Sequence, residues 1–447
     1  MGSEGWQKVH LGSVCVVNPE LRKRDWFYSH IEYIDISSIG TGQMVQPPLV
    51  LPLNDAPSRA QRLVQRGDII VSTVRPNRRS FFYLTDVKPN TVVSTGFAVL
   101  RATDMIDPRF LYYVISNQQF TDYLDANTQG SAYPAVGSQI FENAEVMIPP
   151  LKEQRAIAHI LGTLDDKIEL NRRMNQTLEA IAQVIFKSWF VDFLPVRANM
   201  ARTQTGVPVR VKAAGRQPPG LAHHIAELFP GEFQESELGV IPKGWEVGIL
   251  GEISRKPQYG YTASANDEPV GPKFLRITDI NKLPWIEWSS VPYCEISDEE
   301  FEQYRLREGD ILIARMADPG HGVMIEEDVE AVFASYLIRF PPRDGTYARF
   351  IQYWLRSDSY WELVRARHAG TTRASLNAQV LSVFQLAVPP LAIADAFGKK
   401  VAALRSKVTT NVAESRTLAA LRNSLLPKLI SGELRVRDAE RIVGREV

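Results

Sequence analysis

The chain repeats itself after about 240 residues, and this repeat limits its architecture more than any other feature. Gly5-Trp6 returns as Gly244-Trp245, and the run at 148–151 returns at 388–391. Between positions 110 and 151 the matches keep one offset of 240, which is hard to obtain by chance. The 447 residues therefore predict two copies of one unit, each long enough to bury its own core. Two copies kept only for stability remain the alternative.

Each copy is predicted to be a strand-rich domain followed by a long helix, which makes the fold class α+β. Short β-branched runs mark strand candidates at 31–36, 68–74, 92–100, 274–277, 310–314 and 333–340. Shorter helices are expected near 108–117 and 348–355. The proline pairs at 149–150 and 389–390 favour extended backbone before them and a helix start after them.

The two segments after the proline pairs, 151–190 and 391–430, have heptad character. The predicted seam residues are Ile157, Leu161, Leu164, Ile168, Asn171, Leu178 and Ile185 in the first, and Phe397, Val401, Leu404, Val408, Asn411, Leu418 and Leu425 in the second. Asn411 follows Asn171 by 240 residues, and a polar residue at a seam position fixes register at a cost in stability. We therefore expect the helices, each ~60 Å long, to pair with each other. The alternative is that each packs only on its own domain.

Composition and charge exclude several classes of protein. With 51 basic and 51 acidic residues, the chain does not bind nucleic acid by net charge alone, although local patches can. Two cysteines are too few for a disulfide framework, and no apolar run reaches the ~20 residues of a membrane span. We expect a soluble, cytoplasmic protein. The stretch 195–218 holds no acid and predicts an exposed linker; its basic residues are Arg197, Arg202, Arg210, Lys212 and Arg216.

The motifs of the common catalytic sites are absent from the sequence. No phosphate-binding Gly-x4-Gly-Lys-Ser/Thr loop, Cys-x-x-Cys pair or His-Glu-x-x-His motif occurs, so we expect no ATP hydrolysis, no bound metal and no cofactor in this chain. The His223-His224 pair is interpreted as solvated. The repeated Gly-Asp at 67–68 and 309–310 predicts a turn into a buried strand, with a catalytic aspartate as the less favoured alternative.

Two loops at equivalent places in both copies carry side chains suited to DNA. Arg and Asn can pair with base edges in the major groove, and hydroxyl groups can bind bases or phosphates. The candidates are Ser72, Thr73, Arg75, Asn77, Arg78, Arg79, Ser131 and Tyr133 in the first copy, and Arg315, His321, Arg365, Arg367, His368, Thr371, Thr372 and Arg373 in the second. For any single arginine a solvated surface charge is the alternative. Because the loops agree in position but differ in residues, they fit two readers of different sequences.

Several segments resemble the specificity subunits of Type I restriction-modification systems, and the resemblance spans the chain. The segments are IPPLKEQR at 148–155, the stretch 161–171, FKSWFVDF at 186–193, ELG at 237–239, IPKGW at 241–245 and LLPKLISGEL at 425–434. The resemblance implies target recognition domains at 1–150 and 236–390, a central long helix at 151–193, a linker at 194–235 and a long C-terminal helix with a tail at 391–447. The linker at 195–218 looks longer and richer in arginine than is usual in that family, so DNA backbone contact and plain flexibility are both open for it.

The resemblance also implies a division of labour. The two helices would form an antiparallel coiled coil between the domains, with a pseudo-twofold axis. Two modification subunits, which bind S-adenosylmethionine and methylate adenine, would dock on this chain, and two restriction subunits that use ATP and Mg²⁺ can join them. The chain itself would be non-catalytic and would recognise a bipartite duplex DNA target. The alternatives are a two-armed adaptor without DNA recognition and, with little support, a self-sufficient enzyme.

Overall fold

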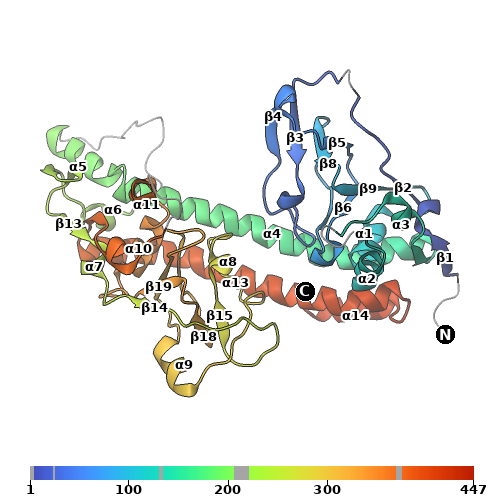
Figure 1. Ribbon diagram of the computed structural model, residues 1–447. Helices are drawn as coiled ribbons and strands as arrows, with labels where there is room; N and C mark the ends of the chain where they lie inside the picture. The colour runs from blue at the N-terminus through green and yellow to red at the C-terminus, as the bar shows by residue number, and fades with distance from the viewer. Residues whose placement is uncertain (1–4, 24–25, 130–133, 206–220, 369–374, 447) are drawn as a thin grey trace. The chain divides into compact units, whose positions relative to one another are not determined.

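The computed structural model describes residues 5–23, 26–129, 134–205, 221–368 and 375–446 (Figure 1). The chain divides into two compact units. Unit 1 consists of Met1–Glu169 with Thr417–Val447, and unit 2 of Leu170–Arg416. Each unit therefore contains a sheet-rich domain, part of one long helix and part of the other. The expected α+β class, with two sheet-rich domains and two long helices packed against each other, is confirmed.

Unit 1 is built on two four-stranded sheets. The first has the order β2-β9-β6-β7 and is antiparallel, and the second has the order β4-β3-β8-β5 with β3 and β8 parallel. The strands are β1 (Gln7–His10), β2 (Cys15–Val17), β3 (His30–Ile34), β4 (Leu49–Pro52), β5 (Ala60–Leu63), β6 (Ile69–Ser72), β7 (Phe81–Tyr83), β8 (Thr91–Ser94), β9 (Phe97–Ala102) and β10 (Glu145–Ile148). The run 92–100, expected as one strand, forms two, because the chain turns at Thr95-Gly96 and its halves join different sheets.

Short helices close unit 1 around a core of aliphatic and aromatic side chains. They are α1 (Pro108–Ser116), α2 (Gln118–Ala126) and α3 (Ser138–Glu142), with single turns of 3₁₀ helix at η1 (Leu11–Ser13), η2 (Ile36–Ser38), η3 (Leu53–Asp55) and η4 (Pro76–Arg78). Helix α1 begins where its sequence dictates: the Asp107 carboxylate accepts from the amides of Arg109 and Phe110, and Pro108 occupies the first turn. The antiparallel pair β1–β10 brings the two ends of the domain together.

Unit 2 repeats this plan with different residues. Its strands are β11 (Phe233–Ser236), β12 (Gly239–Pro242), β13 (Glu246–Ile249), β14 (Gln258–Tyr259), β15 (Lys273–Leu275), β16 (Ile311–Ala314), β17 (Gly322–Met324), β18 (Ala331–Phe333), β19 (Leu337–Phe340) and β20 (Gln385–Val388). Its short helices are α7 (Leu250–Ile253), α8 (Ile277–Ile280), α9 (Asp298–Tyr304), α10 (Tyr347–Trp354), α11 (Asp358–His368) and α12 (Ala378–Ser382). The sheet β14-β19-β16-β17 corresponds to β2-β9-β6-β7, and β13–β20 to β1–β10.

The long helices are α4 (Leu151–Phe190) and α13 (Leu391–Ile430), each of 40 residues. In unit 2 the helices run antiparallel, because positions that rise along α4 meet positions that fall along α13: Asn171 bonds Ser415, Asn175 bonds Asn411, and Glu179 bonds Arg405. In unit 1, Asp165 of α4 meets Arg422 of α13.

The seam residues pack on each other and on the domains at the same time. All of them are buried except Ile168, Leu178 and Leu404, which are half-buried. In unit 1, Leu161 and Leu425 share one core with α1, and in unit 2, Ile185 and Phe397 share one with α10. The long helices therefore pair with each other and also pack on their own domains, although these two arrangements were considered as alternatives.

The segment expected to be an exposed linker begins with a helix, α5 (Leu194–Thr205). Val196 is buried in the core of unit 2, and the Asn199 side chain donates at 2.8 Å to the carbonyls of Ala226 and Phe229. These contacts stabilise the helix that carries Arg197 and Arg202. Its alanine, arginine and methionine residues also favour a helical conformation. A short helix, α6 (His223–Ala226), precedes the second domain, and α14 (Val436–Glu446) follows α13. Arg210, Lys212 and Arg216 lie outside the described residues.

Candidate nucleic-acid interface

The first predicted loop of unit 1 follows β6, and its hydroxyl groups serve the fold. Ser72 is buried and donates to the Val74 carbonyl at 2.8 Å, and Thr73 donates to the Gly96 carbonyl at 2.9 Å. Sequence alone could not distinguish these inward hydroxyls from ones that face solvent. Ser72 and Thr73 thus shape the loop.

The four candidates after Thr73 differ in their surroundings. Asn77 and Arg78 lie on the exposed turn η4, between Arg75 and Arg79, which have left-handed backbone (φ 50° and 55°). Arg79 points back: its guanidinium donates to the Ser116 carbonyl at 2.6 Å and to Gln118, and burial lowers its pKa. A cation at the carboxyl end of α1 stabilises that helix. Of the described side chains in this loop, Asn77 and Arg78 are those presented outward.

The second predicted loop of unit 1 lies against the first. The Arg75 amide donates to the Pro134 carbonyl, and the Val136 amide donates to the Thr73 carbonyl, both at 2.9 Å. These bonds join the two loops through their backbones. Ser131 and Tyr133 lie outside the described residues.

Unit 2 joins its two loops in the same way. The Leu376 amide donates to the Arg315 carbonyl at 2.8 Å, the counterpart of the bond between Val136 and Thr73. The Arg315 guanidinium lies over the Tyr259 ring at 5.0 Å, and the Tyr259 hydroxyl accepts from the Ala378 amide. The arrangement holds Arg315 beside the loop junction.

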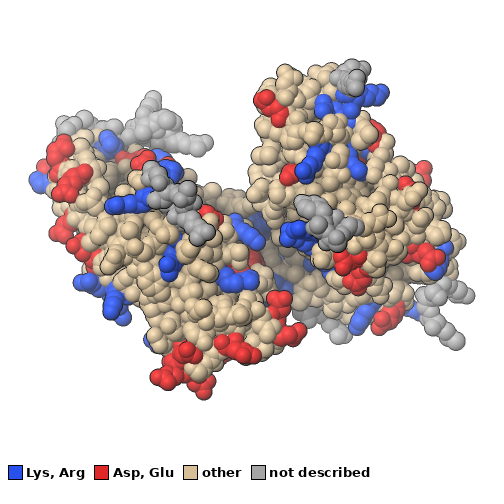
Figure 2. Space-filling view, in the orientation of Figure 1, with Lys and Arg blue, Asp and Glu red and all other residues tan. Residues whose placement is uncertain are grey.

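The described candidates that remain in unit 2 lie on or beside α11. His321 contacts Asp318 at 3.3 Å and the Trp361 ring at 4.9 Å. Arg365 and Arg367 are exposed on α11. Thr371, Thr372, Arg373 and the side chain of His368 lie outside the described residues. Acidic side chains gather instead at the far end of unit 2, over α9, whose first turn carries Asp298, Glu299 and Glu300 (Figure 2).

The repeated Gly-Asp dipeptide is a structural turn in both units, as interpreted from the sequence. Gly67 and Gly309 have φ of 92° and 89°, a conformation that glycine adopts without strain. Asp68 forms two 2.9 Å bonds with Arg101, and Asp310 bonds Arg339 at 3.2 Å. Both carboxylates are buried and paired, so nothing in their setting indicates catalysis.

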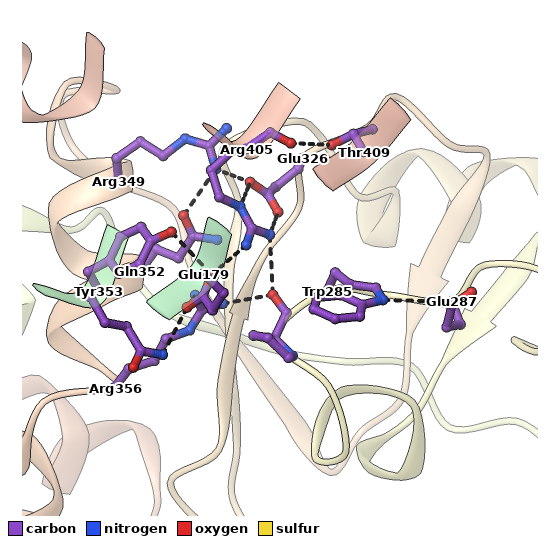
Figure 3. A network of polar contacts seen from close by, with 12 residues as sticks. Glu179, Trp285, Glu287, Glu326, Arg349, Gln352, Tyr353, Arg356, Arg405 and Thr409 are labelled. Carbon is purple, nitrogen blue, oxygen red and sulfur yellow. Dashed lines mark hydrogen bonds and ion pairs between the residues drawn. The ribbon is translucent and has the colours of Figure 1, made fainter. Parts of the chain in front are cut away.

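A buried polar network in unit 2 was not predicted from the sequence (Figure 3). Arg405 of α13 donates to Glu179 of α4 at 2.6 Å and to Glu326, which follows β17, at 2.9 Å. Glu179 also accepts from the Tyr353 hydroxyl at 3.2 Å and from Arg356. Arg349 of α10 reaches Glu326. The network thus connects both long helices with the second domain.

Opposite charges within the network offset the cost of burying its carboxylates and arginines. Burial opposes ionisation of Glu326, but Arg405 and Arg349 overcome it and hold the pKa of that carboxyl below its usual value. Burial raises the pKa of Tyr353, and the negative charge of Glu179 raises it further. Arg405 itself is 1% exposed, so removal of one partner would leave a buried charge without compensation.

Unit 1 has a smaller version of the same arrangement. The Tyr113 hydroxyl donates to Asp165 of α4 at 2.7 Å, and Arg422 of α13 donates to the same carboxylate at 2.6 Å. Arg109 bonds Asp166 at 2.6 Å. The repeat already matched Tyr113 with Tyr353, and this match was the only sequence signal that pointed toward either network.

Other reactive groups have ordinary settings in the described part of the chain. Burial raises the pKa of Cys15 to about 12 and of Cys294 to about 11, which keeps both thiols protonated at neutral pH. His223 pairs with Glu227 at 3.1 Å, and no group of three or more His, Cys, Asp or Glu side chains among the described residues could hold a metal ion. None of the described helices combines the length and apolar character of a membrane span.

Comparison with known proteins agrees with this architecture. The family described as "Type I restriction modification DNA specificity domain" matches residues 3–180. The specificity subunit of the Type I restriction enzyme HindI from Haemophilus influenzae is 26% identical, with 96% of this chain and 99% of that protein covered. The MjaIX specificity subunit from Methanocaldococcus jannaschii is 25% identical, with 84% and 80% covered. The S subunit of a Type I system from M. genitalium shares the fold, with a TM-score of 0.50, 13% identity, and 95% and 96% covered.

The two sheet-rich domains and the pair of long helices form a fold that this S subunit shares. Residues 3–180 match the Type I restriction-modification DNA specificity domain, and most of the chain is similar to Type I restriction-modification specificity subunits. Its function is that of the DNA specificity subunit of such a system, a role that carries no catalysis of its own. These similarities support neither the two-armed adaptor nor the self-sufficient enzyme.

Proposed function

We propose that each unit reads one half of a bipartite duplex target through its joined pair of loops. The observation that carries the proposal is the repeated junction, Thr73 with Val136 in unit 1 and Arg315 with Leu376 in unit 2. The same backbone bond recurs at equivalent positions in both units, while the side chains around it differ. Such a frame suits two readers with different target sequences.

Within each pair of loops, the exposed side chains are the base-reading candidates. Asn77 and Arg78 would act for unit 1, and Arg365 and Arg367 would bind bases or phosphates for unit 2. Ser72, Thr73 and Arg79 would position the first loop rather than touch DNA, because their polar groups already bond the protein. Ser131, Tyr133, His321, His368, Thr371, Thr372 and Arg373 remain candidates.

The same proposal assigns the other activities to partners. The domains at 1–150 and 236–390 would be the target recognition domains. Two modification subunits with S-adenosylmethionine would methylate adenine, and restriction subunits with ATP and Mg²⁺ would cleave. The paired helices would be the scaffold on which they assemble.

The first test is single-molecule sequencing of host DNA with and without this gene. A split methyladenine motif with a fixed gap, lost on deletion of the gene, supports the proposal. An unchanged methylome with active partners present contradicts it.

Arg78→Ala and Arg367→Ala test the assignment of readers. Each should weaken binding by about 1–3 kcal/mol, through the half-site of its own unit only. Binding of the assembled methyltransferase would be measured on duplexes in which one half-site or the other is scrambled. Arg441→Ala and Arg343→Ala remove exposed arginines elsewhere in units 1 and 2 and serve as matched controls. Equal loss at both half-sites would contradict separate readers.

A further inference from the structure

The contacts between the long helices relate each position of α4 to the position 240 residues later in α13. Asn411 donates to Asn175 at 2.8 Å, and Asn171 donates to Ser415 at 3.3 Å. Subtracting 240 from Asn411 gives Asn171, and adding 240 to Asn175 gives Ser415. The first bond is thus converted into the second. The helix pair therefore has a local twofold relation, and a copy of α4 could in principle occupy the place of α13.

The apolar seam does little to prevent such an exchange. Leu164 corresponds to Leu404, Leu178 to Leu418 and Ile185 to Leu425. A pair of α4 helices or a pair of α13 helices would bring similar aliphatic side chains together. Any preference for the unlike pair must come from other residues.

The charged side chains at the seam are not alike in the two helices. Each unit has an ion pair with its acid on α4 and its base on α13: Asp165 with Arg422 in unit 1, and Glu179 with Arg405 in unit 2. The positions equivalent to Arg422 and Glu179 are Ala182 and Ala419. At the equivalent position, neither helix therefore carries the partner for its own charge.

Substitution of one helix by a copy of the other would oppose like charges. In an α4 pair, Asp165 would lose Arg422 and meet Glu179 of the other copy beside the Tyr113 hydroxyl. In an α13 pair, Arg405, buried as it is, would lose Glu179 and meet Arg422. Like charges in a desolvated contact suppress a wrong partner strongly.

We propose that these two ion pairs select the unlike half of the chain as the helix partner and reject a second copy of the same half. The interaction surface is the charged edge of the α4 seam, and the partner that it fits is a helix with arginine at the positions of Arg405 and Arg422. The selection keeps one reader of each kind in every subunit. It follows from the ion pairs alone and does not depend on which bases the loops read.

The test uses the full chain, folded first and then cleaved at a protease site introduced within 206–220. After the nicked protein is unfolded in urea and refolded, native mass spectrometry separates unlike pairs from the two kinds of like pair by mass. The wild type should return unlike pairs in at least about ten-fold excess over like pairs, equivalent to ~1.4 kcal/mol. Random association, with about half of the pairs unlike, would overturn the proposal.

The decisive variant is Asp165→Arg combined with Arg422→Glu. The unlike helices keep an attractive pair between the two substituted positions, 165 and 422. Both like pairs also become attractive: the new arginine at 165 faces Glu179 in an α4 pair, and the new glutamate at 422 faces Arg405 in an α13 pair. Like pairs should therefore appear at several times the wild-type fraction; no increase would contradict the proposal. Asp165→Asn with Arg422→Gln removes the like-charge repulsion without reversing any charge, and should also raise the like-pair fraction. Asp395→Lys with Lys399→Asp reverses an exposed pair of α13 and should change nothing.

Discussion

The two units share one backbone plan but differ in how much buried charge they contain. At equivalent places after β7 and β17, unit 1 has the exposed Thr85, and unit 2 has Glu326, whose side chain is only 10% exposed. The carboxylate beside Tyr113 pairs with one arginine, whereas Glu179 and Glu326 near Tyr353 together pair with three. A fold can therefore be repeated while its dependence on electrostatic pairing changes.

The largest difference between the units should follow from removal of the α13 arginine of each. Arg405→Ala leaves Glu179 and Glu326 buried with reduced compensation and should cost unit 2 about 3–5 kcal/mol. Arg422→Ala removes a more exposed pair and should cost unit 1 ~1 kcal/mol. Hydrogen exchange resolved by peptide would measure each unit separately. Equal losses in both units would remove the distinction drawn between them.

The second-largest difference between the units should be the pH dependence of their stability. The pKa of Glu326 lies below its usual value of 4.5, so the ionised carboxylate stabilises unit 2 above that pH, and this contribution is lost as pH falls through the lowered pKa. Glu326→Gln should therefore destabilise unit 2 at neutral pH, and its difference from the wild type should shrink below pH 4.5. Urea unfolding of both proteins as a function of pH measures this difference. A gap that stays constant down to low pH would contradict the role of the carboxylate charge.

The smallest effect is expected at the paired tyrosines. Tyr353→Phe and Tyr113→Phe each remove one hydroxyl that donates to a carboxylate, at a cost of about 1 kcal/mol or slightly more. Because Glu179 keeps two arginine partners, whereas Asp165 keeps one, Tyr113→Phe should cost at least as much as Tyr353→Phe. Thermal unfolding followed by exchange of α1 and α10 amides would compare them. A much larger loss at Tyr353 would indicate that the hydroxyl organises the whole network.

The parts of the fold that could be predicted are those encoded locally. The heptads and the proline pairs at 149–150 and 389–390 predicted where α4 and α13 begin, because period and backbone restriction act over a few residues. The helix α5 was missed, since its stability depends on Val196 and Asn199 contacting residues that follow much later.

The candidate site was predictable in position but not in side-chain direction. The repeat placed the loops correctly beside β6 and β16, yet polarity alone could not show that Ser72 and Arg79 bond the protein. The charged network was invisible for a similar reason. Glu179 and Arg405 are 226 residues apart, and only the pairing of the helices brings them together.

The backbone junction between the loops has a consequence for how such a protein changes its target. The bonds from Val136 to Thr73 and from Leu376 to Arg315 use only amide and carbonyl groups, which every residue type except proline provides in full. Mutations that exchange the outward side chains therefore leave the frame of the loops intact. Under the proposed function, new sequence preferences would arise in one unit at little cost in folding, while the other unit would continue to read its own half of the target.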